Sequence, residues 1–210
     1  MDNRRGELFG RKRIGNRGRS SQCEAMPPQM LEEIKSLVAT AEPPELGPGP
    51  RDGIRSAREL NTALEKLFSG SARVSHSTEL IRAVVLLWHD HLEEAHLIAQ
   101  VIENRDGSFV HAIMHRREPD YGNAKYWFRR TGTHSCFPEI AGRSLALFEA
   151  EGEKASQTKI IPGGQWDAFA FVDACEEAAR TPATDRRIRS LREIQRIETE
   201  VLLEFLSRSR

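Results

Sequence analysis

Hydrophobic side chains recur every three to four positions along most of this chain, which is the period of an amphipathic α-helix. The clearest case covers residues 185–207, where charged side chains on the opposite face have the i,i+4 spacing that supports a helix. The apolar positions of this segment are Ile188, Leu191, Ile194, Val201, Leu202 and Phe205. The pattern predicts a long amphipathic helix at this end of the sequence.

A second helical pattern, from 78 to 88, is apolar nearly all round. Its apolar residues are Leu80, Ile81, Val84, Val85, Leu87 and Trp88. A helix without a polar face is covered on every side by its neighbours. We therefore predict that this helix lies at the centre of a bundle.

Short polar signals predict where other helices begin. Ser56 and Glu59 have the spacing of a capping box. Asp167 is expected to cap another helix, with Trp166 and Phe171 forming a hydrophobic staple across it.

Pro119 separates two further helices. Because the residue before a proline is pushed out of the α region, the helix that starts near 108 must end near Glu118. Asp120 then follows at the position of an N-cap for a helix over 121–130.

Together these patterns predict an all-α fold, a compact bundle of antiparallel αα-hairpins. Residues 91–95 and 120–124 each open a helix after a short polar turn, and the 29-residue offset between them resembles tetratricopeptide arrays in geometry only. Few helical signals occur over about 131–165, apart from 141–150, so we expect a long irregular connection there.

The N-terminal part is predicted to divide into an arm, a helix and a linker. Residues 1–25 should be a disordered basic arm or the product of an overextended start, because they have no apolar periodicity. Residues 26–53 combine a short helix with a Pro- and Gly-rich linker, which should leave that helix loosely attached. The main helical domain then covers 54–210.

Composition and charge narrow the class of protein. The longest apolar run, 83–88, is far shorter than the roughly 20 residues of a membrane-spanning helix. Residues 1–20 contain seven basic and two acidic side chains, a net charge of +5, so the rest of the neutral chain is at −5. A mildly acidic body argues against nucleic-acid binding, except weakly through the basic arm. Three widely spaced cysteines favour a reducing, cytoplasmic location.

The strongest candidate chemistry is a group of histidines beside Pro119. His111 and His115 are four residues apart, so both imidazoles lie on one helix face with Glu118. His96, on the preceding helix, would add a third nitrogen if the hairpin packs antiparallel. Such a set can hold a divalent metal ion, although no HExxH motif is present. The alternative is a polar face that is solvated or packed against aromatic residues, and in either case a nearby carboxylate would raise the histidine pKa values.

Four arginines, at 116, 117, 129 and 130, frame the Pro119 turn. They form either a fork for a phosphate or carboxylate, or an internal network with Glu118 and Asp120. We favour the internal network, because carboxylates able to pair with these arginines are already present. Tyr126 points away from the apolar sector and is a surface candidate for stacking.

Two weaker motifs have structural interpretations. His89-Asp90-His91 is reminiscent of the His-Asp pair of metal-dependent phosphohydrolases, but a polar turn between helices explains it better. His134 and Cys136 form a conceivable thiol–imidazole pair, for which i,i+2 spacing in a loop is weak support.

From 111 to 130 the chain has the motif HAxxHRxExDxxNAxYWFRR, preceded by His96, Ile98 and Gln100. In this motif it resembles a family of bacterial and fungal proteins whose members have no assigned function. The resemblance covers about 88–206 and implies a compact helical domain without implying an activity.

We therefore expect a non-catalytic interaction domain or a small-ligand-binding domain, with a metal-dependent hydrolase as the alternative. The sequence implies no cofactor other than a metal at His96, His111 and His115, and identifies no partner or oligomeric state. The candidate binding cluster consists of His96, His111, His115, Arg116, Glu118, Asp120, Asn123, Tyr126 and Arg130.

Overall fold

The computed structural model describes residues 26–69, 75–182 and 185–208, and within these ranges it has ten α-helices and no strand. The all-α prediction is therefore confirmed. The helices are α1 (Pro28–Val38), α2 (Ala57–Phe68), α3 (His76–Trp88), α4 (Leu92–Ala99), α5 (Arg105–Arg117), α6 (Tyr121–Thr131), α7 (Phe137–Glu151), α8 (Lys154–Ile160), α9 (Ala168–Ala178) and α10 (Arg186–Leu206), with a short 3-10 turn at Pro162–Gly164.

The residues that were predicted to begin helices lie at the N-terminal ends of observed helices. Ser56 and Glu59 form the predicted capping box of α2. Asp167 caps α9 through two backbone N–H groups, and the rings of Trp166 and Phe171 lie 5.1 Å apart across it, as a staple requires. These signals act within a few residues, so no tertiary context is needed to interpret them.

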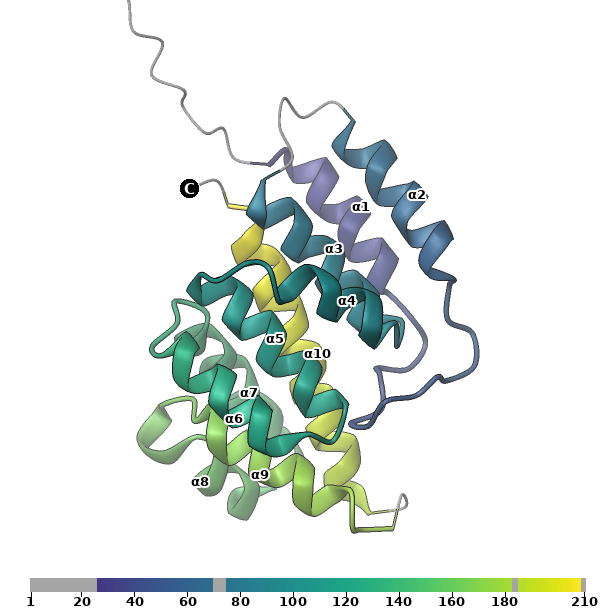
Figure 1. Ribbon diagram of the computed structural model, residues 1–210. Coiled ribbons are helices and arrows are strands. Elements are labelled where there is room, and N and C mark those ends of the chain that lie inside the picture. The colour runs from purple at the N-terminus through teal and green to yellow at the C-terminus, as the bar shows by residue number, and fades with distance from the viewer. Residues whose placement is uncertain (1–25, 70–74, 183–184, 209–210) are drawn as a thin grey trace, which may run out of the picture.

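Two helices organise the core. Every residue of α3 from Leu80 to Trp88 is buried except Arg82, which confirms its predicted central position. α10 packs against α1, α3, α7 and α9, and Figure 1 shows it running behind α5 through the length of the bundle. α5 and α6 form one antiparallel hairpin, and α3 and α4 form another.

The expectation of a loosely attached first helix is wrong. Ile34 is fully buried in α1, which packs against α3 and α10. The Pro- and Gly-rich segment after it is also held to the bundle, since Arg192 donates to the carbonyls of Pro43 and Pro44. Prolines prevented a helix here, as predicted, but long-range hydrogen bonds fix the segment to the domain.

The long irregular connection expected at 131–165 is also wrong, because α7 and α8 occupy most of it. Pro138 lies in the first turn of α7, where a missing N–H costs nothing. Gly152 ends the helix in the left-handed region at φ 73°. Between them only four residues are buried, which explains the weak periodic signal.

The predicted arm, 1–25, lies outside the described residues. Among the described helices, none combines the length and the apolar character needed to cross a lipid bilayer.

Candidate metal centre

Two of the three candidate histidines lie on α5. The first turn of this helix packs closely against the chain that joins it to α4. Asn104 caps α5 by accepting from the backbone N–H of Gly107 at 2.7 Å. A Cβ at Gly107 would lie 1.9 Å from the carbonyl oxygen of Ile102, so only glycine allows this approach. The glycine thereby helps to bring α4 against α5.

The other end of α5 follows the prediction made from Pro119. The helix ends at Arg117, and the carboxylate of Asp120 caps α6 by accepting from the backbone N–H of Asn123 at 3.2 Å. Both helices of the hairpin are therefore fixed at the turn by local interactions.

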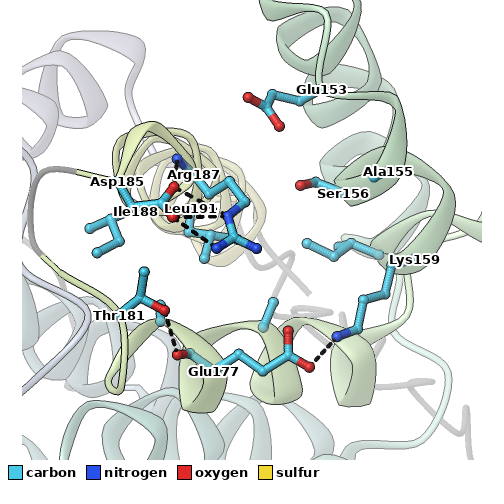
Figure 2. A pocket seen from close by; sticks show the side chains of 13 residues that line it. Glu153, Ala155, Ser156, Lys159, Glu177, Thr181, Asp185, Arg187, Ile188 and Leu191 are labelled. Atoms are coloured by element: carbon cyan, nitrogen blue, oxygen red, sulfur yellow. Dashed lines mark hydrogen bonds and ion pairs between the residues drawn. The ribbon is translucent and has the colours of Figure 1, made fainter.

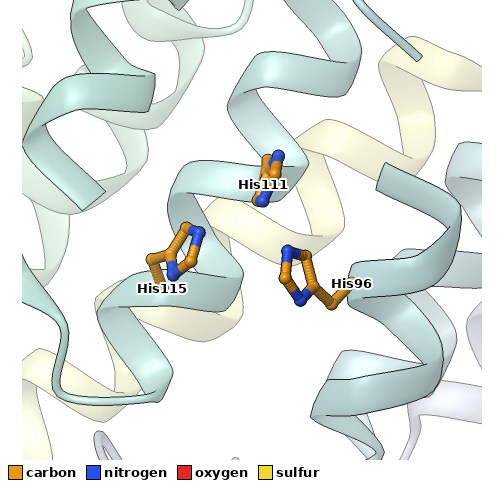
Figure 3. A group of neighbouring side chains, drawn as sticks. All are labelled: His96, His111 and His115. Atoms are coloured by element: carbon orange, nitrogen blue, oxygen red, sulfur yellow. The ribbon is translucent and has the colours of Figure 1, made fainter. Parts of the chain in front are cut away.

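His96 from α4 meets His111 and His115 from α5 between the two helices (Figure 3). The ring centroids are 4.8 Å apart for His96 and His111, 5.4 Å for His96 and His115, and 4.8 Å for His111 and His115. One ring nitrogen from each residue lies within 4.8 Å of the other two. Three imidazoles, two from α5 and one from α4, thus face a common space.

The histidine face of α5 is covered rather than solvated. His111 is 3% exposed and His115 is 6% exposed, while His96 is half-buried. The indole of Trp127, on α6, stacks on the ring of His111 with centroids 3.9 Å apart. Of the two alternatives for a polar face, the structure therefore shows packing against an aromatic residue.

His111 has no hydrogen-bond partner among the residues that the structure describes. This holds for both Nδ1 and Nε2, although both atoms are inaccessible to solvent. Burial, reinforced by the neighbouring His115 and His96, lowers the pKa of His111 to about 3. The ring is therefore neutral at physiological pH, with a nitrogen lone pair turned into the protein.

His115 has a carboxylate beside it but is not made more basic. Oε2 of Glu118 lies 3.2 Å from its Nδ1, although the two groups are not aligned as a hydrogen bond, and Asp120 is 4.0 Å away. Burial lowers the pKa of His115 more than Glu118 raises it. The carboxylates raise the pKa of His115 as expected, but desolvation is the larger effect, so the net shift is downward.

The arginines of the predicted cluster do not pair as expected. Arg116 is fully buried and forms two hydrogen bonds with Glu198 on α10, at 3.1 and 2.5 Å. Arg117 donates to Asp90 at 2.6 Å. Since α5 is surrounded by other helices, its arginines reach carboxylates far along the chain. The predicted pairs with Glu118 or Asp120 do not form among the described residues.

The remaining predicted residues surround the histidines from the α6 side. Tyr126 is 46% exposed and meets Trp127 edge-on, with centroids 5.4 Å apart. The guanidinium of Arg130 lies 5.1 Å from the Trp127 centroid. Asn123 donates from its side chain to Asp120 and lies at the surface. None of these three side chains is a ligand in the histidine group.

His89-Asp90-His91 has the structural role of a polar turn. His89 bonds the carbonyl of Leu37 at 2.7 Å, Asp90 accepts from the backbone and side chain of Arg51, and His91 bonds the carbonyl of Arg55 at 2.8 Å. His89 also accepts from the backbone N–H of Arg55 at 3.2 Å, so all three side chains bond the segment between α1 and α2, which no local pattern indicated.

His134 is also used structurally. Its Nε2 lies 3.0 Å from Asp106, and its Nδ1 accepts from the backbone N–H of Cys136 at 3.2 Å. The ring is therefore engaged on both sides by groups other than the Cys136 thiol.

A separate cavity of about 160 Å³ lies among α8, α9 and the start of α10, and shares no residue with the histidine group (Figure 2). Lys159 pairs with Glu177 at 2.5 Å and Arg187 pairs with Asp185 at 2.8 Å on its rim. These four charged groups already have partners and are not available to a ligand in the cavity.

Comparison of the chain with known protein families, with curated proteins and with solved structures finds no match. The family resemblance and the tetratricopeptide-like geometry therefore stay predictions.

Proposed function

We propose that this chain is a small-ligand-binding helical domain whose ligand is a divalent transition-metal ion, held by His96, His111 and His115. The observation that carries the proposal is the buried His111 ring, neither of whose nitrogens has a partner. Leaving a buried polar group unsatisfied costs about 1–3 kcal/mol. A metal ion among the three rings would remove that cost.

The electrostatics of the site suit a dication. Metal ligation requires neutral imidazoles, and burial already keeps His111 neutral. Glu118 and Asp120 contribute two carboxylates next to the cluster without occupying the space between the rings. They would balance the charge of the bound ion.

The three imidazole ligands also restrict which metal ions the site can bind. Imidazole nitrogens suit zinc, copper, nickel and iron better than magnesium or calcium, which prefer oxygen ligands. For tetrahedral zinc the nitrogens must approach to about 3.4 Å from one another, given bonds of about 2.1 Å. Side-chain rotations have to close the present separations of up to 4.8 Å.

Metal titration of the EDTA-treated full chain tests the proposal. Calorimetry with zinc should show one equivalent bound with a Kd at or below about 1 μM. The variant His111→Phe keeps an aromatic ring against Trp127 but removes both nitrogens, and should weaken binding by more than about 100-fold, the upper end for loss of a supporting group. His76→Phe makes the same change at the exposed start of α3 and is the control.

Two results would overturn the proposal: no zinc binding by the wild-type chain, or equal binding by the His111→Phe variant. Circular dichroism of both variants separates loss of a ligand from loss of the fold.

The second candidate is an interaction domain, which one observation favours. Leu97, on α4, and Val101, just after the end of this helix, are 59% and 72% exposed. Exposed apolar pairs of this kind occur at protein interfaces. Sedimentation velocity of the wild type and of a Leu97→Ser, Val101→Ser variant would reveal self-association through them.

We also propose a cytoplasmic location, because the three cysteines are widely spaced in the sequence.

A further inference from the structure

The histidine group offers three ligands and no fourth. Among the described residues, no other histidine, cysteine, aspartate or glutamate joins His96, His111 and His115. Structural zinc sites are closed by four protein ligands, whereas catalytic zinc sites have three protein ligands and a water molecule. The number of ligands therefore places this centre in the open class.

The surroundings of the site leave a route to solvent. His96 is only half-buried, and the side chains of Glu118 and Asp120 are 35% and 51% exposed. Tyr126, at 46% exposure, continues this surface on the α6 side. A ligand in the fourth position could thus exchange with bulk water or with a small substrate.

We propose that the ion bound by the three histidines holds a water molecule in its fourth position, and that this water hydrolyses small uncharged acyl esters. The inference rests on the proposed metal binding. The preference for uncharged substrates follows from the charged side chains around the histidines. Glu118 and Asp120 border the site, while Arg116 and Arg117 form ion pairs with Glu198 and Asp90. An anionic substrate would meet two carboxylates without an available guanidinium from α5.

The reaction needs no further reactant. The ion lowers the pKa of its bound water so that hydroxide forms near neutral pH, and the released proton goes to solvent. The hydroxide oxygen forms a bond to the acyl carbon, the bond from that carbon to the alcohol oxygen breaks, and the proton that the hydroxide carried passes through solvent water to the alcohol oxygen. The products are a carboxylate and an alcohol, and a second water molecule restores the centre.

Glu118 acts as a positioning residue in this scheme. Its Oε2 lies 3.2 Å from Nδ1 of His115. A side-chain rotation that aligned these two groups as a hydrogen bond would place the proton on Nδ1 and leave the Nε2 lone pair for the metal, as in many carboxylate–histidine–metal arrangements.

Hydrolysis of p-nitrophenyl acetate by the zinc-loaded full chain tests the activity. The rate is expected to exceed that of the EDTA-treated chain by about 100-fold and to rise with pH through about 7. The His111→Phe variant should lose the zinc-dependent rate, and the His76→Phe variant should retain it. A zinc-dependent rate no greater than that of the same zinc concentration without protein would overturn the inference.

A spectroscopic experiment tests the open position independently of activity. In the cobalt-substituted protein, neutral imidazole should displace the water and change the visible absorption spectrum. If cobalt binds but imidazole leaves the spectrum unchanged, the centre is closed and this inference fails while metal binding stands. If neither zinc nor cobalt binds, the proposed function itself fails.

Discussion

The buried ion pair between Arg116 and Glu198 allows the most quantitative prediction. Both side chains are completely inaccessible to solvent, and two hydrogen bonds join them. The guanidinium carbon of Arg116 also lies 4.5 Å from the ring centroid of Phe171. The pair therefore links α5, which carries two of the three cluster histidines, to α10 and α9.

The variant Glu198→Leu removes one partner and leaves a guanidinium buried without a counter-charge. Breaking a buried pair in this way costs about 3–5 kcal/mol. A domain of this size has a free energy of unfolding of about 5–15 kcal/mol, so the loss would be a large fraction of the total. The double variant Arg116→Met, Glu198→Leu replaces both charges by apolar groups, and should recover most of the stability.

Urea denaturation followed by circular dichroism measures this difference. The experiment is done in EDTA, because a bound metal would add its own stabilisation to the folded state. The reasoning is refuted if the Glu198→Leu variant unfolds within about 1 kcal/mol of the wild type, or if the double variant is no more stable than this single variant. The double variant should still bind zinc, since Arg116 is not a ligand.

Four other predictions concern single side chains. Asp120→Ala removes the cap of α6 and should lower stability by about 1 kcal/mol in urea denaturation. Asp90→Asn leaves Arg117 buried without its counter-charge and should cost about 3 kcal/mol in the same assay, and an unchanged midpoint would contradict this. Glu118→Ala should weaken zinc binding by about 10- to 100-fold in calorimetry without unfolding the chain. Burial lowers the pKa of His89, so the neutral ring is favoured by folding; its contribution is present above the unfolded pKa of about 6.5 and is lost as pH falls below it. The urea midpoint should therefore decrease more steeply between about pH 7 and 5 in the wild type than in a His89→Gln variant.

The parts of the fold that could be predicted from the sequence depend on interactions between near neighbours. The capping box of Ser56 and Glu59 and the cap at Asp120 join residues three positions apart. The i,i+4 spacing of His111 and His115 likewise determines their common face once the helix is recognised. These features needed no knowledge of which helices pack together.

The features that sequence reasoning missed depend on packing between remote segments. Arg116 had two carboxylates within four residues, yet its partner is Glu198, 82 positions away. The direction of its side chain is set by the place of α5 in the bundle, which its own sequence does not contain. The same holds for the segment between α1 and α2, whose prolines indicated a linker but whose carbonyls bind Arg192 on α10.

The histidines show why a functional site is hard to distinguish from a structural one in the sequence. The chain has seven histidines, and three of the buried or half-buried ones, His89, His91 and His134, bond backbone or carboxylate groups. His111 is equally buried but has no partner on either nitrogen. The residues next to these histidines in the sequence do not reveal which ring is satisfied, and only the packed structure separates the satisfied rings from the unsatisfied one. Because a buried unsatisfied imidazole destabilises the fold by itself, its presence between two further histidines is the strongest physical argument for a bound ion.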